Sequence, residues 1–142
     1  MNATIRPATP GDADAVAGLL GELGYPSEIE PCRRRIVQLS RNAADQVLIA
    51  ATREGILGLA SLHVMPVFHR DDHLCRITAF VVAERHRGMG VGRQLVQAVV
   101  EFARKRDCFR VEVTSGSDRR DAHTFYRRIG FTQAGPRFFV DI

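Results

Sequence analysis

The sequence predicts an α/β domain in which helices pack on a mixed β-sheet. Apolar runs rich in β-branched residues alternate along the chain with amphipathic segments of helical spacing. Short clusters of Gly, Pro and polar residues separate these segments. The predicted order of elements is β-α-α-β-β-β-α-β-α-β, which is typical of the α/β class. The 142 residues have the length of one domain, which we place at residues 1–142.

The first third of the chain predicts one strand and two helices. Residues 4–6 form a short strand, and Asp12 can cap the first helix. The apolar stripe of that helix consists of Val16, Leu19, Leu20 and Leu23. The turn residues 24–26 end the helix. Pro31, in a first turn, opens the second helix, whose apolar residues are Ile36, Val37 and Leu39.

The rest of the chain predicts five strands and two helices. A hairpin over residues 46–53 and 56–65, joined by Glu54 and Gly55, precedes a buried strand at residues 77–82. A long helix follows, and its apolar stripe consists of Val91, Leu95, Val99 and Phe102. The remaining predicted elements are a strand at 109–114, a helix that Ser117 or Asp118 can cap, and a closing strand at 138–140.

Three glycines lie on the turn between the buried strand and the long helix. They are Gly88, Gly90 and Gly92. The first N–H groups of a helix have no internal partner, and glycines let an anion approach the main chain closely. The turn therefore predicts a phosphate or pyrophosphate site. It lacks the Gly-Lys-Ser/Thr ending of a P-loop, and its glycine spacing does not fit a dinucleotide fingerprint.

A second segment, residues 122–131, predicts a helix with one apolar face. Ala122, Phe125, Tyr126 and Ile129 are spaced three and four apart. Gly130 stands at a C-cap position, and Phe131 would start a new strand. From the pattern alone, Tyr126 either packs in the core or contributes its hydroxyl to a functional site.

The composition excludes several functional classes. No run of eighteen apolar residues exists, and the N-terminus lacks an apolar signal core, so we expect a cytoplasmic protein without a membrane partner. The net charge is +4, but the basic clusters 33–35 and 104–106 contain no interleaved aromatic residues, so nucleic-acid binding is not expected. The three widely spaced cysteines, Cys32, Cys75 and Cys108, predict reduced thiols.

Together, two segments resemble the signatures of the GNAT superfamily of N-acetyltransferases. Arg87, Gly90 and Gly92 fill the pattern Arg-x-x-Gly-x-Gly. About thirty-five residues later, residues 122–131 fill the pattern Ala-x-x-Phe-Tyr-x-x-x-Gly-Phe. The resemblance covers nearly the whole chain. It implies a mixed, mostly antiparallel central sheet in which two neighbouring strands splay apart at one end.

The resemblance also implies that acetyl-CoA is the acetyl donor and that no metal is needed. The turn would wrap the pyrophosphate with Arg87, Gly88, Met89, Gly90, Val91, Gly92 and Arg93. Phe80, Val81 and Val82 would pair with the pantetheine arm, since an unpaired strand edge suits an extended ligand that carries amides. Arg119 stands where the family often has asparagine, and its side chain either reaches the phosphates or lies in water.

The resemblance assigns two catalytic roles and leaves one open. The backbone N–H of Val82, or of a neighbour, would stabilise the oxyanion, and Tyr126 would protonate the leaving thiolate. Thr78 and Ala79 stand where the family often carries a glutamate, so the general base is not identified. The candidates are Glu22, His63, Glu112 and a chain of water molecules.

The expected acceptor is a primary amine on a small molecule. Residues 121–126 resemble a small-molecule subgroup of the family that includes aminoalkylphosphonate N-acetyltransferase. A protein or peptide acceptor and a non-catalytic acyl-CoA-binding module are the alternatives. The loop from His69 to His73 carries metal-ligand residue types without a second cluster, which favours a solvated loop over a metal site. Dimers are frequent in the family, and the last strand is a candidate for mediating a homodimer.

Overall fold

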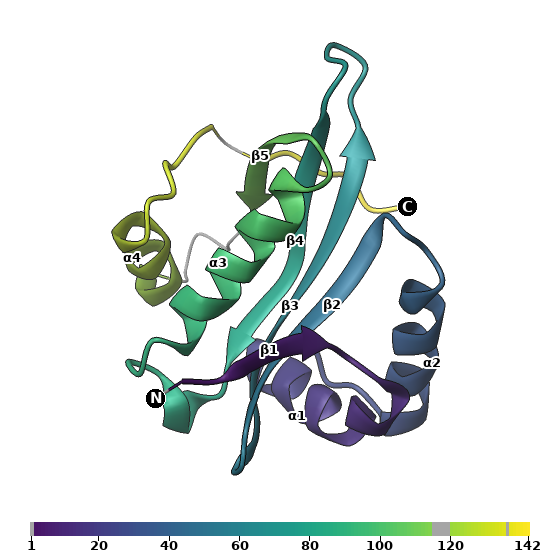
Figure 1. The fold of residues 1–142 in the computed structure, drawn as a ribbon, viewed down its shortest axis with the longest axis vertical. Coiled ribbons are helices and arrows are strands. Elements are labelled where there is room, and N and C mark those ends of the chain that lie inside the picture. The colour runs from purple at the N-terminus through teal and green to yellow at the C-terminus, as the bar shows by residue number, and fades with distance from the viewer. Residues whose placement is uncertain (1, 115–119, 136) are drawn as a thin grey trace.

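In the described part of the chain, five strands form a single sheet in the order β1-β2-β3-β4-β5 (Figure 1). The computed structural model describes residues 2–114, 120–135 and 137–142. The strands are β1 (Thr4–Pro7), β2 (Asp45–Thr52), β3 (Gly55–Pro66), β4 (His73–Val82) and β5 (Cys108–Val113). Neighbouring strands are antiparallel except for the parallel pair β4 and β5. This arrangement confirms the mixed, mostly antiparallel sheet that the family resemblance implies.

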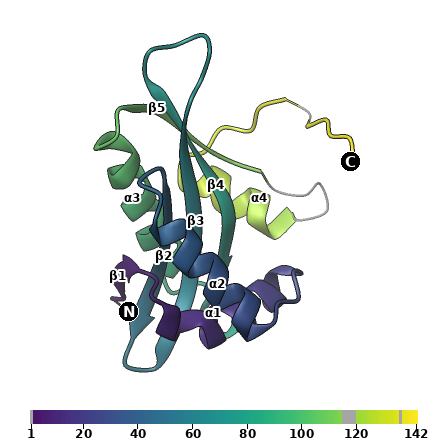
Figure 2. The same ribbon diagram turned by 90° about the vertical axis from the view of Figure 1, so that its right-hand side faces the viewer.

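Helices cover both faces of the sheet (Figures 1 and 2). The helices are α1 (Ala13–Leu23), α2 (Ile29–Ser40), α3 (Val91–Arg104) and α4 (Arg120–Arg128), with 3-10 turns η1 (Pro10–Asp12) and η2 (Glu84–His86). α1 and α2 pack on one face, and α3 packs on the other. No helix among the described residues is both long and apolar enough to cross a bilayer.

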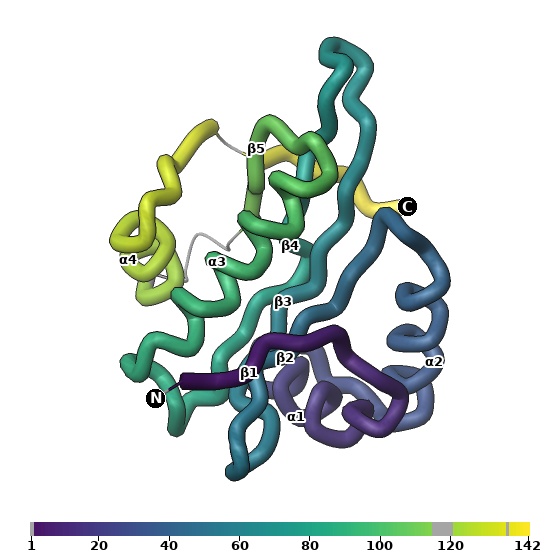
Figure 3. The backbone as a smooth tube through the Cα atoms, viewed as in Figure 1, coloured from purple at the N-terminus to yellow at the C-terminus, as the bar shows by residue number. Residues whose placement is uncertain are grey.

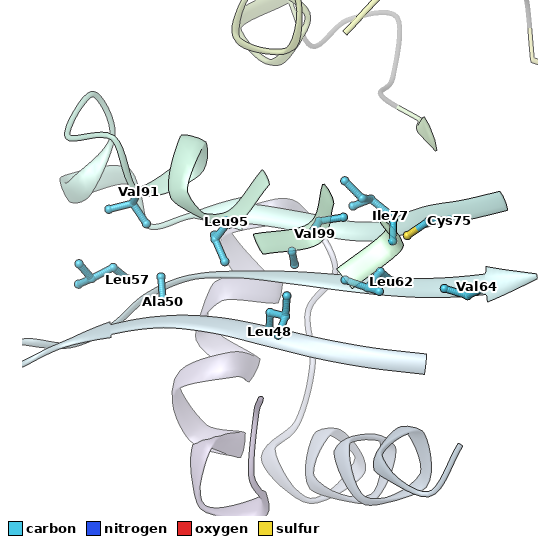
Figure 4. Packing of buried hydrophobic residues seen from close by; sticks show 12 residues of the cluster. Leu48, Ala50, Leu57, Leu62, Val64, Cys75, Ile77, Val91, Leu95 and Val99 are labelled. Atoms are coloured by element: carbon cyan, nitrogen blue, oxygen red, sulfur yellow. The ribbon is translucent and has the colours of Figure 1, made fainter. Parts of the chain in front are cut away.

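The α3 face holds the larger part of the core (Figure 4). Leu95 and Val99 of α3 point at the sheet, Leu62 of β3 lies near Val99, and all three side chains are almost completely buried. Burying a side chain of this size contributes about 1.5–3 kcal/mol to folding. The helical spacing that the sequence shows over residues 91–102 therefore corresponds to the contact between α3 and the sheet.

One extra residue in β4 changes which side chains face α3. Ile77 pairs with Leu62 and Ala79 pairs with Ser61, so Thr78 has no opposite residue and forms a β-bulge. Ile77 faces α3 before the bulge, and Phe80 faces it afterwards. A regular strand would place residues 77 and 79 on the same face. The bulge thus aims Phe80 towards the α3 side of the sheet.

β4 and β5 pair along only part of their length. Their register runs from His73–Cys108 to Ile77–Val113, whereas β4 continues to Val82. On the side of β5, residues 78–82 therefore have no strand partner among the described residues. The predicted separation of two neighbouring central strands is present at this end of β4. Figure 3 shows α4 beside the first turns of α3.

The closing strand predicted at residues 138–140 is not formed. Phe138, Phe139 and Val140 are exposed, and Figure 2 shows the segment after α4 extending away from the sheet. A short apolar segment gains little as a strand unless a neighbour pairs with it. The strand predicted to start at Phe131 is also absent, although its ring packs on the core. The proposed caps Ser117 and Asp118 lie outside the described residues.

Candidate active site

The glycine turn leaves the first N–H groups of α3 open to a ligand. Gly88 and Gly90 have φ values of +80° and +86°, in the left-handed region that favours glycine. Gly90 is the N-cap of α3, and as a glycine it has no side chain with which to cap the helix. The first internal bond runs from the Gln94 N–H to the Gly90 carbonyl, at 3.1 Å. The N–H groups at the start of α3 therefore fit an anion.

Gly92 has a different role from the other two glycines. A Cβ atom at this position would lie 2.8 Å from Cζ of Phe125 and 3.0 Å from its Cε1. The absence of a side chain at Gly92 therefore lets α4 pack directly on the first turn of α3. Sequence reasoning assigned all three glycines to the ligand and had no means of identifying this contact.

The side chain of Arg87 turns back onto β4. Its Nε donates a hydrogen bond to the Val82 carbonyl over 3.2 Å. The preceding residue, His86, is buried, and its Nε2 lies 3.2 Å from Oε2 of Glu54 in the β2–β3 turn. These two contacts tie the turn to the end of β4 and to the hairpin. Met89 and Arg93, also predicted to contact the ligand, are exposed on the turn.

Main-chain groups of β4 point alternately towards β3 and towards the gap. The Ala83 N–H donates to the Leu57 carbonyl over 2.8 Å, and the Val81 carbonyl also points at β3, close to Gly58. Successive residues of a strand direct their N–H and C=O groups to opposite sides. The main-chain groups of Phe80 and Val82 are therefore directed to the unpaired side.

Four aromatic rings form a cluster beside the unpaired end of β4. The Tyr126 ring lies 5.9 Å from Phe80, 5.4 Å from Phe125 and 5.4 Å from Phe131, measured between centroids. Phe80 and Phe125 also stack at 5.8 Å. Offset and edge-to-face contacts of this kind hold each ring in place. The fold thus brings the glycine turn, Val82 and Tyr126 into one region.

The base candidates lie in three different environments. Nδ1 of His63 lies 2.6 Å from Oδ1 of Asp45, which is mostly buried. Glu22 accepts a hydrogen bond from the Glu84 N–H at 2.8 Å, beyond the end of β4, and lines an open hollow of about 720 Å³ there. The third candidate, Glu112, forms ion pairs with two arginines.

Asp45, which contacts His63, is not identifiable from the sequence pattern. The two residues are directly opposite in the antiparallel register of β2 and β3. Counting outward from the predicted turn at Glu54 and Gly55 comes close to this pair, but the bulge between Ala50 and Ala51 shifts the register. The carboxylate partner was therefore not visible from spacing alone. Arg119, the remaining predicted ligand residue, lies outside the described residues.

The histidine-rich loop before β4 is held by an ion pair. Arg70 contacts Asp72 with two hydrogen bonds of 2.6 and 3.0 Å, and its guanidinium stacks over the Phe109 ring at 4.2 Å. The described residues contain no group of three or more His, Cys, Asp or Glu side chains that could hold a metal ion. Asp72 is thus engaged by an arginine.

The sequence matches known proteins along most of its length. A model of the acetyltransferase (GNAT) family matches residues 16–131. The aminoalkylphosphonate N-acetyltransferase of Salmonella typhimurium is 32% identical over 142 residues, covering 94% of this chain and 88% of that protein. The glucosamine 6-phosphate N-acetyltransferase of Trypanosoma brucei brucei is 32% identical over 77 residues, covering 54% of this chain and 50% of that protein.

Solved structures show the same fold. The structure of a transcriptional regulator from Bacillus halodurans superposes with a TM-score of 0.90 at 24% identity, covering 99% of this chain and 100% of that one. At 24% identity, the match shows that the two chains share a fold. It supports the order of strands and helices from β1 to α4.

Proposed function

This chain belongs to the acetyltransferase (GNAT) family, whose members depend on acetyl-CoA, and we propose that it acetylates the primary amine of a small molecule. The observation that carries the proposal is the conjunction of an uncapped helix start, an unpaired strand edge and a tyrosine within one region. Each of the three suits a different part of an acetyl-CoA-dependent transfer.

The glycine turn fits the pyrophosphate of coenzyme A. The N–H groups of Val91, Gly92 and Arg93 begin α3 without a side-chain cap, and the helix dipole favours negative charge there. Gly88 and Gly90 add main chain without side chains that would shield it. Arg87 supports the turn by its bond to the Val82 carbonyl.

We place the pantetheine arm along the unpaired edge of β4. The main-chain groups of Phe80 and Val82 are directed to this side, whereas those of Val81 pair with β3. An extended amide-bearing arm can pair with such an edge as an additional strand would. The Val82 N–H, or that of Phe80 farther from the turn, would then donate to the oxygen on which negative charge develops.

Tyr126 is our candidate acid for the departing thiolate. Its ring contacts Phe80, whose main chain borders the gap. A phenol carries its proton at neutral pH and can give it to a nearby thiolate. The three surrounding rings fix the direction of the ring, which is the positioning that such a transfer needs.

We propose His63 as the general base, with Asp45 as its orienting partner. The carboxylate can only accept, so in the neutral imidazole Nδ1 would carry the hydrogen of the 2.6 Å contact and Nε2 would be left as the acceptor. His63 pairs with Arg76, close to the point where β5 ends and the gap begins. Glu22 and Glu112 suit the role less well because an N–H group and two guanidinium groups engage their oxygens.

The two N-acetyltransferases described above support a small-molecule acceptor. Their names describe the acetylation of an aminoalkylphosphonate and of glucosamine 6-phosphate, both of which are small amines. The first of these relatives aligns along most of both chains. A peptide acceptor is the alternative that the following experiment tests directly.

The experiment is a screen of amines with acetyl-CoA, in which the released thiol is measured. The panel should contain aminophosphonates, amino sugars, polyamines, amino acids and peptides with a free N-terminus. We expect turnover with at least one small amine and none with the peptides. Calorimetry with coenzyme A provides an independent check of the site. Binding without turnover on any amine would indicate an acyl-CoA-binding module, and peptide turnover alone would exclude the small-molecule acceptor.

A further inference from the structure

Four charged or titratable residues lie side by side across four strands. Asp45 pairs with His63, His63 with Arg76, and Arg76 with Glu112 in the registers of β2 to β5. Cross-strand neighbours of this kind are about 5 Å apart. The row lies on the face opposite α3, since the alternate residues Leu62, Cys75 and Val111 point into the α3 core.

The end of this row at β5 contains two arginines and one carboxylate. Nη2 of Arg76 lies 3.0 Å from Oε2 of Glu112, and Nη1 of Arg110 lies 3.6 Å from the other oxygen of the same carboxylate. Glu112 thus holds both guanidinium groups and neutralises only one of them. Their side chains remain 45% and 62% exposed, so a ligand in solution can reach them.

These arginines lie beside the opening between β4 and β5. The pair Arg76–Glu112 is followed by the last pair, Ile77–Val113, after which the strands separate. Arg76 is therefore roughly 7 Å along β4 from Thr78, the first unpaired residue. Arg76 stands between His63 on β3 and Glu112 on β5, so an acceptor that enters from this face meets His63 and both arginines beside the gap.

We propose that Arg76 and Arg110, oriented by Glu112, bind an oxyanion group of the acceptor. The inference rests on the proposed function and specifies its substrate class, a small molecule with a primary amine at one end and a phosphonate, phosphate or carboxylate at the other. A guanidinium presents five N–H donors in a planar fork that matches such groups, and one ion pair occupies only part of it. The amine is left free to point at the gap.

The direct test compares three acceptors that share an aminoethyl group: aminoethylphosphonate, beta-alanine and ethanolamine. We expect kcat/KM to be about tenfold or more higher for an anionic acceptor than for ethanolamine. In R76Q the advantage should fall about tenfold or more, mainly through KM, while ethanolamine turnover and the KM for acetyl-CoA stay within about twofold. Comparing kcat/KM for aminoethylphosphonate and beta-alanine shows which oxyanion the site prefers.

R104Q is the matched control. Arg104 forms a comparable exposed ion pair with Glu101 on α3, away from the row, so its loss should change none of these constants. Equal losses of R76Q on anionic and neutral acceptors would overturn the proposal, as would a weakened affinity for acetyl-CoA, which would assign the arginines to the coenzyme.

Calorimetry separates this proposal from the proposed function. Aminoethylphosphonate and beta-alanine are titrated into protein saturated with coenzyme A, so no turnover is required. Binding of either oxyanion by the native protein that weakens about tenfold in R76Q supports the anion site, even if no amine is acetylated. No binding of either oxyanion, or equal binding by R76Q, refutes the site while the acetyl transfer to other amines stands.

Discussion

Tyr126 shows how one side chain can be fixed without being buried in the main core. Three rings surround it, and Phe80 links it to the strand whose edge is unpaired. We expect Tyr126→Phe to retain these ring contacts and to lower kcat by about a hundredfold, because only the proton donor is removed. The measurement is thiol release at saturating acetyl-CoA.

Thermal unfolding of the Tyr126→Phe protein serves as the control for its fold. A full kcat in a protein that unfolds like the native one would remove Tyr126 from the mechanism. A parallel loss of affinity for coenzyme A would instead assign the hydroxyl to binding.

His63 and Asp45 form a close pair across β2 and β3, with 2.6 Å between Nδ1 and Oδ1. If His63 is the base, His63→Gln should lower kcat/KM for the amine by about a hundredfold and flatten the acidic side of its pH profile. Asp45→Asn should cause a smaller loss because it keeps the imidazole but changes its orientation. An unchanged pH profile in His63→Gln would show that another group accepts the proton.

At the scale of elements, Asp12 fastens the start of α1 to β1. It accepts hydrogen bonds from both terminal nitrogens of Arg6 and from the Thr9 N–H, and the Arg6 contact is the main reason that its pKa is lowered to about 2. The carboxylate therefore stabilises the fold above its ordinary pKa of 3.8, and this contribution is lost as the pH falls towards 2.

We expect Asp12→Asn to lower the free energy of unfolding by about 1–2 kcal/mol at neutral pH. Urea unfolding of both proteins between pH 7 and 2 measures this difference, which should narrow as the native carboxylate becomes protonated. A gap of constant size across that range would mean that the ion pair with Arg6 is not its source.

The contact between α3 and α4 depends on the missing side chain of Gly92. A methyl group there would lie 2.8 Å from Phe125, whose ring is held by Phe80 and Tyr126. We expect Gly92→Ala to lower the free energy of unfolding by about 1–3 kcal/mol and to raise the KM for acetyl-CoA. Urea unfolding and steady-state kinetics are the measurements.

Gly18→Ala is the matched control for Gly92→Ala. Gly18 lies in α1 with nothing within 4 Å of a built Cβ, so alanine should stabilise the helix by about 0.5–1 kcal/mol. Opposite signs for the two substitutions would support the packing explanation. Similar stabilisation by both would show that Phe125 moves aside at little cost.

Sequence patterns predicted elements whose determinants are local. The stripe of α3, the turn of the β2–β3 hairpin and the helix that carries Tyr126 all follow from spacing within one segment. The register between strands was not predictable in the same way. The Thr78 bulge, the Asp45 partner of His63 and the pairing of Arg76 with Glu112 each join segments far apart in the chain.

At the scale of the whole molecule, the C-terminal segment differs from its predicted place. Phe138 is 88% exposed, Phe139 74% and Val140 82%, while β5 forms the edge of the described sheet. Exposed apolar residues with strand-forming character and an open strand edge favour association between copies of the chain. We therefore expect a homodimer in which this segment contacts the partner.

Sedimentation of the native chain and of the double variant Phe138→Ser, Phe139→Ser tests this expectation. The native chain should sediment as a dimer, and the variant should sediment as a monomer with an unchanged helix content. A native chain that is monomeric at high concentration would contradict the expectation, and a dimer that persists in the variant would place the interface elsewhere.

Thr78 is one residue more than the pairing of β4 with β3 requires. Its hydroxyl donates to the Ser61 carbonyl over 3.2 Å, an accessory contact. Another side chain at this position would leave its neighbours aimed as they are. Deleting the residue would place Ala79 directly after Ile77, opposite Ser61 and Leu62 in regular alternation, so Phe80 would keep both its face and its contact with Tyr126. The length of β4 is therefore not constrained at this position, because the bulge closes when its extra residue is removed.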